Sequence, residues 1–205
     1  MDIYLAIEDI LSEAVAKKLL EASGFDFQIQ HSFCKQGNGY LKSNLEKFRK
    51  IAQTTPVLLL TDLDNEDCAP ILIRRWLGKK TVPNSLLFRV AVRETEAWLL
   101  ADAEGFAAFS GVPPNKIPQD VESMPDPKSK LIELVRHYGN RSVKADIVPE
   151  PGVIAKVGLA YNATLCTFVS EYWSPERAER VTDSLARTRL SITELHRMVN
   201  ANKLN

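Results

Sequence analysis

The sequence has no excess of either charge, because its 26 basic and 26 acidic side chains give a formal net charge of zero. No overall electrostatic field therefore draws the chain to nucleic acid. It also has no long hydrophobic run: the stretch Val57 to Leu60 is far too short to cross a bilayer core about 30 Å thick. Glu8 and Asp9 interrupt the N-terminal apolar stretch that could serve as a signal peptide. We therefore expect no membrane partner and a cytoplasmic location.

Cysteine is scarce, and its three positions (Cys34, Cys68 and Cys166) are widely scattered without CxxC spacing. An odd number of such residues cannot all pair, so the chain is not a disulfide-stabilised secreted domain. The expected state is reduced thiols in a cytosolic protein. With 205 residues, of which 45% are hydrophobic and 25% charged, the chain can form one sizeable core, alone or with a helical extension.

Strand and helix patterns alternate in the first half of the chain. A short apolar run at Ile3 to Ile7 precedes helical spacing over Leu11 to Leu20, and Phe25 to Phe33 is typical of a second strand. The continuous apolar run from Val57 to Thr61 is typical of a strand buried in a parallel sheet, and Leu86 to Val92 predicts another strand. This order predicts a mostly parallel α/β sheet flanked by helices, that is, a Rossmann-like fold.

The second half predicts helices. We expect an α/β core over residues 1–110 and a mainly helical extension over 111–205, packed on that core as a single compact domain, with five prolines in Gly111 to Pro127 as an ordered connection. Helical patterns occur at Lys128–Tyr138, around Thr164–Tyr172 and at Pro175–Met198. Seven apolar positions of this part are expected to be buried: Leu131, Leu134, Val135, Leu165, Phe168, Val169 and Leu190.

Carboxylates follow two of the predicted strands. Glu8 comes at the end of the first, and Asp62 and Asp64 come directly after the most hydrophobic one. In a parallel sheet, ligands bind outside the carboxyl ends of the strands, and carboxylates without cysteine or histidine partners suit Mg²⁺ or Mn²⁺. The alternative is that Asp62 and Asp64 belong to a solvated turn before the next helix. Asp9 could add a metal ligand, but capping the following helix is the better interpretation.

The motifs Tyr4-Leu5-Ala6-Ile7-Glu8 and Leu59-Leu60-Thr61-Asp62-Leu63-Asp64 resemble those of the Toprim fold family, which places a glutamate after its first strand and an Asp-x-Asp pair after a later one. The segment Arg93-Glu94-Thr95-Glu96-Ala97-Trp98-Leu99-Leu100-Ala101-Asp102 is similar to one in a bacterial Toprim-related family with an OLD-nuclease-like core, often encoded beside an ATPase in phage-defence loci. Shorter pieces around Asp126, Val157 and Ser184 extend the similarity along nearly the whole chain. One departure is Asp9, where many Toprim proteins have glycine.

The resemblance implies that Glu8 is a general acid/base or metal ligand and that Asp62 and Asp64 hold the metal, Mg²⁺ or Mn²⁺. Glu94 and Glu96 follow a predicted strand, so either could approach the same site, and we include Glu96 among the metal ligands; a carboxylate favoured by the helix dipole is the alternative. Lys128 and Arg187 are candidates for binding substrate phosphate, with an ordinary solvated face as the alternative.

Charge is distributed unevenly: residues 1–127 carry 14 basic and 18 acidic side chains, whereas 128–205 carry 12 and 8. This asymmetry suits a metal site facing a phosphate-binding surface, although it also arises by chance. The leading hypothesis is a divalent-metal-dependent nuclease or related phosphoryl-transfer enzyme with an ATPase partner and nucleic acid as substrate. The alternative is a non-catalytic Toprim-like module that binds a partner protein or nucleic acid.

Overall fold

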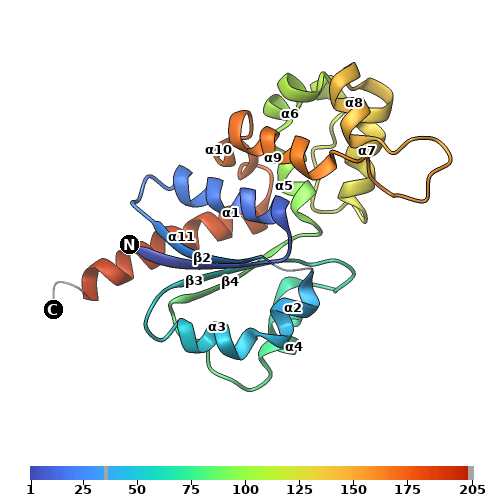
Figure 1. Ribbon diagram of the computed structural model, residues 1–205. Helices are drawn as coiled ribbons and strands as arrows, with labels where there is room; N and C mark the ends of the chain where they lie inside the picture. Colours follow the sequence, from blue (N-terminus) through green and yellow to red (C-terminus); the bar gives the residue numbers. More distant parts are fainter. Residues whose placement is uncertain (35–36, 203–205) are drawn as a thin grey trace. The chain divides into compact units, whose positions relative to one another are not determined.

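The chain divides into two compact units. The computed structural model describes residues 1–34 and 37–202 (Figure 1). One unit comprises Met1–Val92 together with Ser184–Asn205, and the other comprises Arg93–Asp183. The division therefore differs from the expected boundary after residue 110, because the helices that follow Arg93 pack with later helices and the C-terminal helix belongs with the first unit.

The first unit is an α/β layer structure. Its strands are β1 (Asp2–Ile7), β2 (Gln28–Cys34), β3 (Val57–Asp62) and β4 (Leu86–Ala91). Its helices are α1 (Ile10–Ala22), α2 (Asn38–Ser43), α3 (Leu45–Ile51), α4 (Ala69–Leu77) and α11 (Asp183–Asn202). The strands pair in the order β2-β1-β3-β4, and all three pairings are parallel. The expected Rossmann-like α/β fold is thus confirmed.

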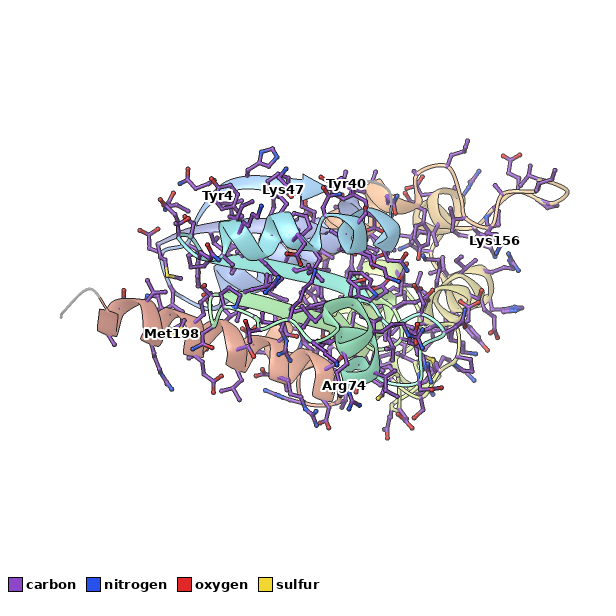
Figure 2. The ribbon with its side chains drawn as sticks, turned by 90° about the horizontal axis from the view of Figure 1, so that it is seen from below. Tyr4, Tyr40, Lys47, Arg74, Lys156 and Met198 are labelled. Carbon is purple, nitrogen blue, oxygen red and sulfur yellow. The ribbon has the colours of Figure 1, made fainter. Side chains whose placement is uncertain are left out.

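Helices cover both faces of this sheet. On one face, buried side chains of α2, α3 and α4 such as Leu41, Phe48 and Leu72 pack against Leu59 and Phe88 of the strands. Figure 2 shows this face from below, with Tyr40 on α2, Lys47 on α3 and Arg74 on α4 labelled. Helix α1 lies on the opposite face (Figure 1). Two-sided burial explains why β3 is an uninterrupted apolar run rather than an alternating one.

Helix α11 packs against the sheet along β4. Its buried positions Leu185, Thr188, Ile192 and Leu195 repeat every three or four residues, so they form one helix face. The hydroxyl oxygen of Thr188 accepts a hydrogen bond of 3.4 Å from Nε of Arg89 on β4. Leu190 lies on the opposite side of the helix and is 55% exposed, so the expectation that it is buried was wrong.

The second unit is helical. Its elements are α5 (Thr95–Ala101), α6 (Ala103–Ser110), the 3₁₀ turn η1 (Pro114–Lys116), α7 (Pro127–Tyr138), α8 (Arg141–Ile147), α9 (Tyr161–Glu171) and α10 (Pro175–Ala178). The helix expected over Pro175–Met198 is therefore two helices, because the chain turns between α10 and α11. The other six apolar positions expected to be buried are buried, all within this unit: Leu131, Leu134, Val135, Leu165, Phe168 and Val169.

Two aromatic side chains and one ion pair hold the second unit together. Trp98 and Trp173 are almost completely buried, and Nε1 of Trp173 donates a 3.0 Å hydrogen bond to the Trp98 carbonyl. Asp102 is fully buried and pairs with Arg177 at 2.6 Å and 2.7 Å. The Asp102 carboxylate also accepts from two backbone amides, so its buried charge is well compensated. Across the described residues, no helix is long and apolar enough to cross a membrane.

Candidate functional site at the carboxyl edge of the sheet

The candidate site lies where the chain changes direction across the sheet. After β1 the chain crosses to β2 on one side, and then returns to β3 on the other side of β1. Doubly wound sheets bind ligands in the crevice at such a switch point, outside the carboxyl ends of the two neighbouring strands. Ile7 at the end of β1 pairs with Leu60 of β3, so Glu8 and Asp62 follow at the same edge of the sheet.

Glu8 is held against the end of β3. Its Oε1 accepts a hydrogen bond of 3.1 Å from the Asp62 amide and another from the hydroxyl of Thr61. Thr61 is almost completely buried at this position. The structure therefore brings Glu8 to the Asp62 backbone and adds Thr61, which the sequence did not indicate, while the convergence of the Glu8, Asp62 and Asp64 carboxylates stays a prediction.

The ionisation of Glu8 is perturbed by its surroundings. Burial raises the pKa of Glu8 above its ordinary value, while the hydrogen bonds from Thr61 and the Asp62 amide lower it, and the nearby charges of Asp64 and Asp9 raise it further. The net effect is a raised pKa, so this carboxyl keeps its proton more readily than an exposed glutamate does.

Asp64 adopts a backbone conformation that residues other than glycine rarely adopt. Its φ is 52°, and among the described residues it is the one non-glycine residue with positive φ. This left-handed conformation costs about 1 kcal/mol or more for a residue with a Cβ, although aspartate and asparagine tolerate it best. The Asn38 side-chain amide donates a 3.0 Å hydrogen bond to Oδ2 of Asp64. Such strained residues cluster at functional sites, so Asp64 is the most informative position of the loop after β3.

Asp9 caps helix α1, as we expected in preference to a metal-binding role. Its side chain accepts a 2.8 Å hydrogen bond from the Ser12 amide. Capping of this kind satisfies an amide that has no partner within the helix. The Asp9 charge still reaches Glu8 and raises its pKa.

The expected metal site stays a prediction. Within residues 1–34 and 37–202, no group of three or more His, Cys, Asp or Glu side chains is arranged to hold a metal ion. Glu8 and Asp64 follow neighbouring strands, and both offer carboxylate oxygens, the ligand type that Mg²⁺ prefers. Mg²⁺ usually keeps several waters and is held by only one or two carboxylates plus substrate phosphate, so the chemistry of these two side chains suits the ion.

Glu96 and Lys128 belong to the second unit, where they contact each other. The buried Glu96 carboxylate accepts a 2.8 Å hydrogen bond from the Tyr161 hydroxyl, and the Lys128 ammonium lies 3.4 Å from it. The Lys128 amide donates at 2.9 Å to Glu94, whose pKa is raised, chiefly by burial. These contacts tie α5 to α7 and α9. The proposed metal-binding role of Glu96 and the phosphate-binding role of Lys128 stay predictions.

Arg187, the second candidate for binding phosphate, is exposed on α11 in the first unit. Its charge lies near Arg89 of β4 and lowers the pKa of that guanidinium, whose burial is the larger cause. The two arginines therefore place positive charge on the α11 side of β4.

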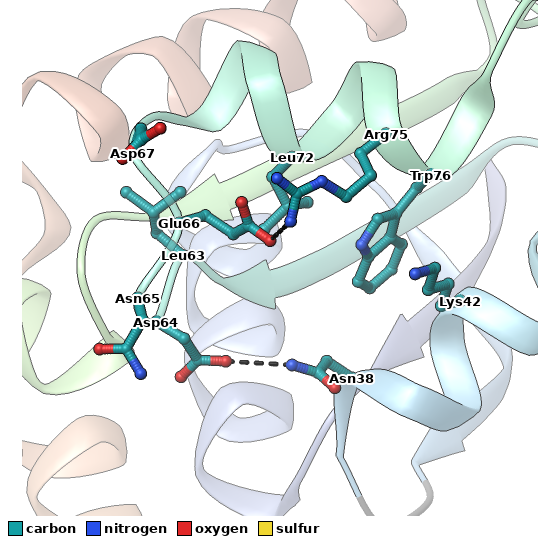
Figure 3. Close-up of a pocket in the computed structure, with 10 residues that line it drawn as sticks. All are labelled: Asn38, Lys42, Leu63, Asp64, Asn65, Glu66, Asp67, Leu72, Arg75 and Trp76. Atoms are coloured by element: carbon teal, nitrogen blue, oxygen red, sulfur yellow. Dashed lines mark hydrogen bonds and ion pairs between the residues drawn. The ribbon is translucent and has the colours of Figure 1, made fainter.

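A polar pocket of about 460 Å³ opens beside Asp64 (Figure 3). The sequence did not predict this pocket, because the walls of the pocket come from segments far apart along the chain: α2, the loop after β3, and α4. Among its lining residues, Asp64 is the one that the sequence predicted as a site residue. Its lining residues are Asn38, Lys42, Leu63, Asp64, Asn65, Glu66, Asp67, Leu72, Arg75 and Trp76.

Comparison of the chain with protein-family models, with curated proteins and with solved structures gives no match. The likeness to Toprim proteins therefore rests on the motifs quoted above.

Proposed function

We propose that the chain is a Mg²⁺- or Mn²⁺-dependent phosphodiesterase, a nuclease of the Toprim type, that acts at the carboxyl edge of its sheet. One observation carries the proposal: Glu8 and Asp64 follow two adjacent parallel strands at the switch point, and Glu8 Oε1 is hydrogen-bonded to the amide of Asp62, two residues before Asp64. Uncompensated repulsion between carboxylates costs stability, and a divalent cation removes that cost.

Glu8 and Asp64 would hold the metal ion, and Asp62 would add a further carboxylate beside them. A bound Mg²⁺ polarises a phosphate, lowers the pKa of a coordinated water and neutralises charge on the leaving oxygen. Asp64 is suited to this role because its strained backbone keeps the carboxylate beside Asn38, at the mouth of the pocket.

Glu8 would also move a proton. Hydrogen bonds from Thr61 and the Asp62 amide orient its carboxyl, and burial raises its pKa above the ordinary value. In the protonated state Glu8 can donate to a leaving oxygen, and in the ionised state it can accept a proton from attacking water. General acid/base is one of the two alternative roles, beside metal ligand, that the Toprim resemblance implies for Glu8.

Cleavage of single-stranded DNA and RNA in Mn²⁺ tests the proposal. We expect wild-type protein to cleave, and Glu8→Gln and Asp62→Asn to lose at least about 100-fold in rate, the lower range for removal of a general acid/base. Asp120→Asn, an exposed substitution in the second unit, is the matched control and should cleave like wild type. Cleavage that persists in Glu8→Gln and Asp62→Asn would contradict the proposal.

A non-catalytic binding module is the alternative, favoured by the lack of a three-ligand group among the described side chains. This alternative predicts that the protein does not cleave nucleic acid and that metal stabilises wild type and Asp62→Asn equally. It also predicts that both proteins bind an ATPase or nucleic acid. The Toprim resemblance supports an ATPase partner. The cysteines Cys34, Cys68 and Cys166 form no disulfide, which supports a reducing, cytoplasmic location.

A further inference from the structure

The pocket beside Asp64 is lined by a tryptophan that also packs against the core. Trp76 on α4 lines the pocket and is half-buried, whereas the other tryptophans, Trp98 and Trp173, are almost completely buried in the second unit. Trp76 packs against Phe88 of β4 at 5.3 Å between ring centroids. This contact supports the indole from the sheet side, so the ring is held in place while it borders the pocket.

The surroundings of Trp76 are polar. In Figure 3 Lys42 lies near the indole, whereas the Arg75 guanidinium points toward Glu66; Asp64, Glu66 and Asp67 lie in the loop after β3. The Arg75 guanidinium forms an ion pair with Glu66, so those two charges offset each other. Lys42 on α2 is exposed, and no described carboxylate pairs with it. One lysine near an aromatic ring suits a flat group that carries one phosphate.

One carboxamide adds to the recognition surface. Asn38, on the same helix as Lys42, lines the pocket, and its carboxamide offers both a donor and an acceptor. Donor–acceptor pairs of this kind match the edges of nucleobases. The volume of about 460 Å³ lies in the range of small-molecule sites and admits one nucleotide.

From these features we infer that the pocket is a nucleobase subsite in which a base stacks on Trp76, its edge contacts Asn38, and its phosphate lies near Lys42. The inference rests on the proposed function, because it assigns the substrate of that same site as a single-stranded nucleic acid or a free nucleotide. A base inside a duplex cannot stack on the indole, so the subsite selects unpaired nucleotides.

Binding is measured in EDTA, where no metal-dependent cleavage occurs. The full-length protein is titrated with AMP, CMP, a short single-stranded oligonucleotide and the same sequence as a duplex, while tryptophan fluorescence is recorded. We expect saturable quenching by the single strand and the mononucleotides, and much weaker quenching by the duplex. Trp98 and Trp173 are buried, so the signal reports on Trp76.

Variants separate stacking from phosphate contact. Polarisation of a labelled single strand gives affinity without using tryptophan, and we expect Trp76→Leu to weaken binding about 5- to 100-fold. Lys42→Met should weaken binding and make it less dependent on salt. One phosphate contact gives a slope of about −0.7 for log affinity against log salt concentration, and this slope should approach zero in the variant. Lys50→Met, which removes an exposed lysine of α3 outside this pocket, is the matched control.

Quenching by none of the nucleotides, equal affinity for the duplex, or equal affinity in Trp76→Leu would overturn the inference. So would quenching by arginine or spermidine but not by nucleotides, because that result makes the pocket a cation site. Failure of the proposed function has a different outcome, namely single-strand binding in EDTA that depends on Trp76 with no cleavage in Mn²⁺.

Discussion

Replacing Asp64 by asparagine should make the protein more stable than wild type when no divalent metal is present, and less stable than wild type when the metal is bound. Asparagine tolerates the left-handed backbone at least as well as aspartate, so φ of 52° poses no obstacle. The substitution also removes a charge that repels Glu8. In EDTA we therefore expect Asp64→Asn to be more stable than wild type, by a few tenths to about 1 kcal/mol, the range for exposed charge pairs.

Metal changes the order. At a Mn²⁺ concentration ten times the dissociation constant, binding stabilises wild type by RT ln 11, about 1.4 kcal/mol. Asp64→Asn lacks one of the two carboxylates and should gain much less. For a chain of this size 1 kcal/mol corresponds to about 2–4 °C in melting temperature. The variant should therefore have a higher free energy of unfolding than wild type in EDTA and a lower one in Mn²⁺.

The measurement is urea unfolding followed by circular dichroism, in EDTA and at increasing Mn²⁺. Asp64→Ala is the second variant: it also removes the charge, but alanine in the left-handed region costs about 1 kcal/mol, so it should not be more stable than wild type in EDTA. Parallel metal responses in wild type and Asp64→Asn, or an asparagine variant less stable than wild type in EDTA, would refute the reasoning.

Three further outcomes follow from single side chains. Because burial raises the pKa of Glu8, the contribution of this carboxyl to stability is fully present below the pKa of the unfolded state and is lost as pH rises through the pKa of the folded state. Glu8→Gln should therefore reduce the pH dependence of the free energy of unfolding, measured in EDTA. Asp102→Ala should cost about 3–5 kcal/mol in urea unfolding, since it leaves the partner charge unpaired, while Asp120→Ala should change stability by less than about 0.5 kcal/mol. Tyr161→Phe should cost about 1–3 kcal/mol because it removes a donor to buried Glu96, and an unchanged unfolding midpoint would contradict that role.

Local patterns in the sequence determined the sheet and the position of its acidic edge. The apolar run of β3 and the alternation of strands with helices depend on neighbouring residues, and parallel pairing then places Glu8 and Asp62 at one edge. The Asp9 cap is equally local, because a side chain at that position reaches the Ser12 amide without help from the rest of the chain.

Contacts between distant segments decided the rest. The α11 helix joins the first unit because its face with Leu185 and Ile192 is buried there, and no local pattern states which sheet a helix will cover. The left-handed turn at Asp64, the hydrogen bond from Thr61 to Glu8 and the support of Trp76 by Phe88 each depend on tertiary packing. Hydrophobic periodicity indicates which side chains are buried, but it does not indicate which of them contact each other in the folded chain. A binding pocket depends on those tertiary contacts.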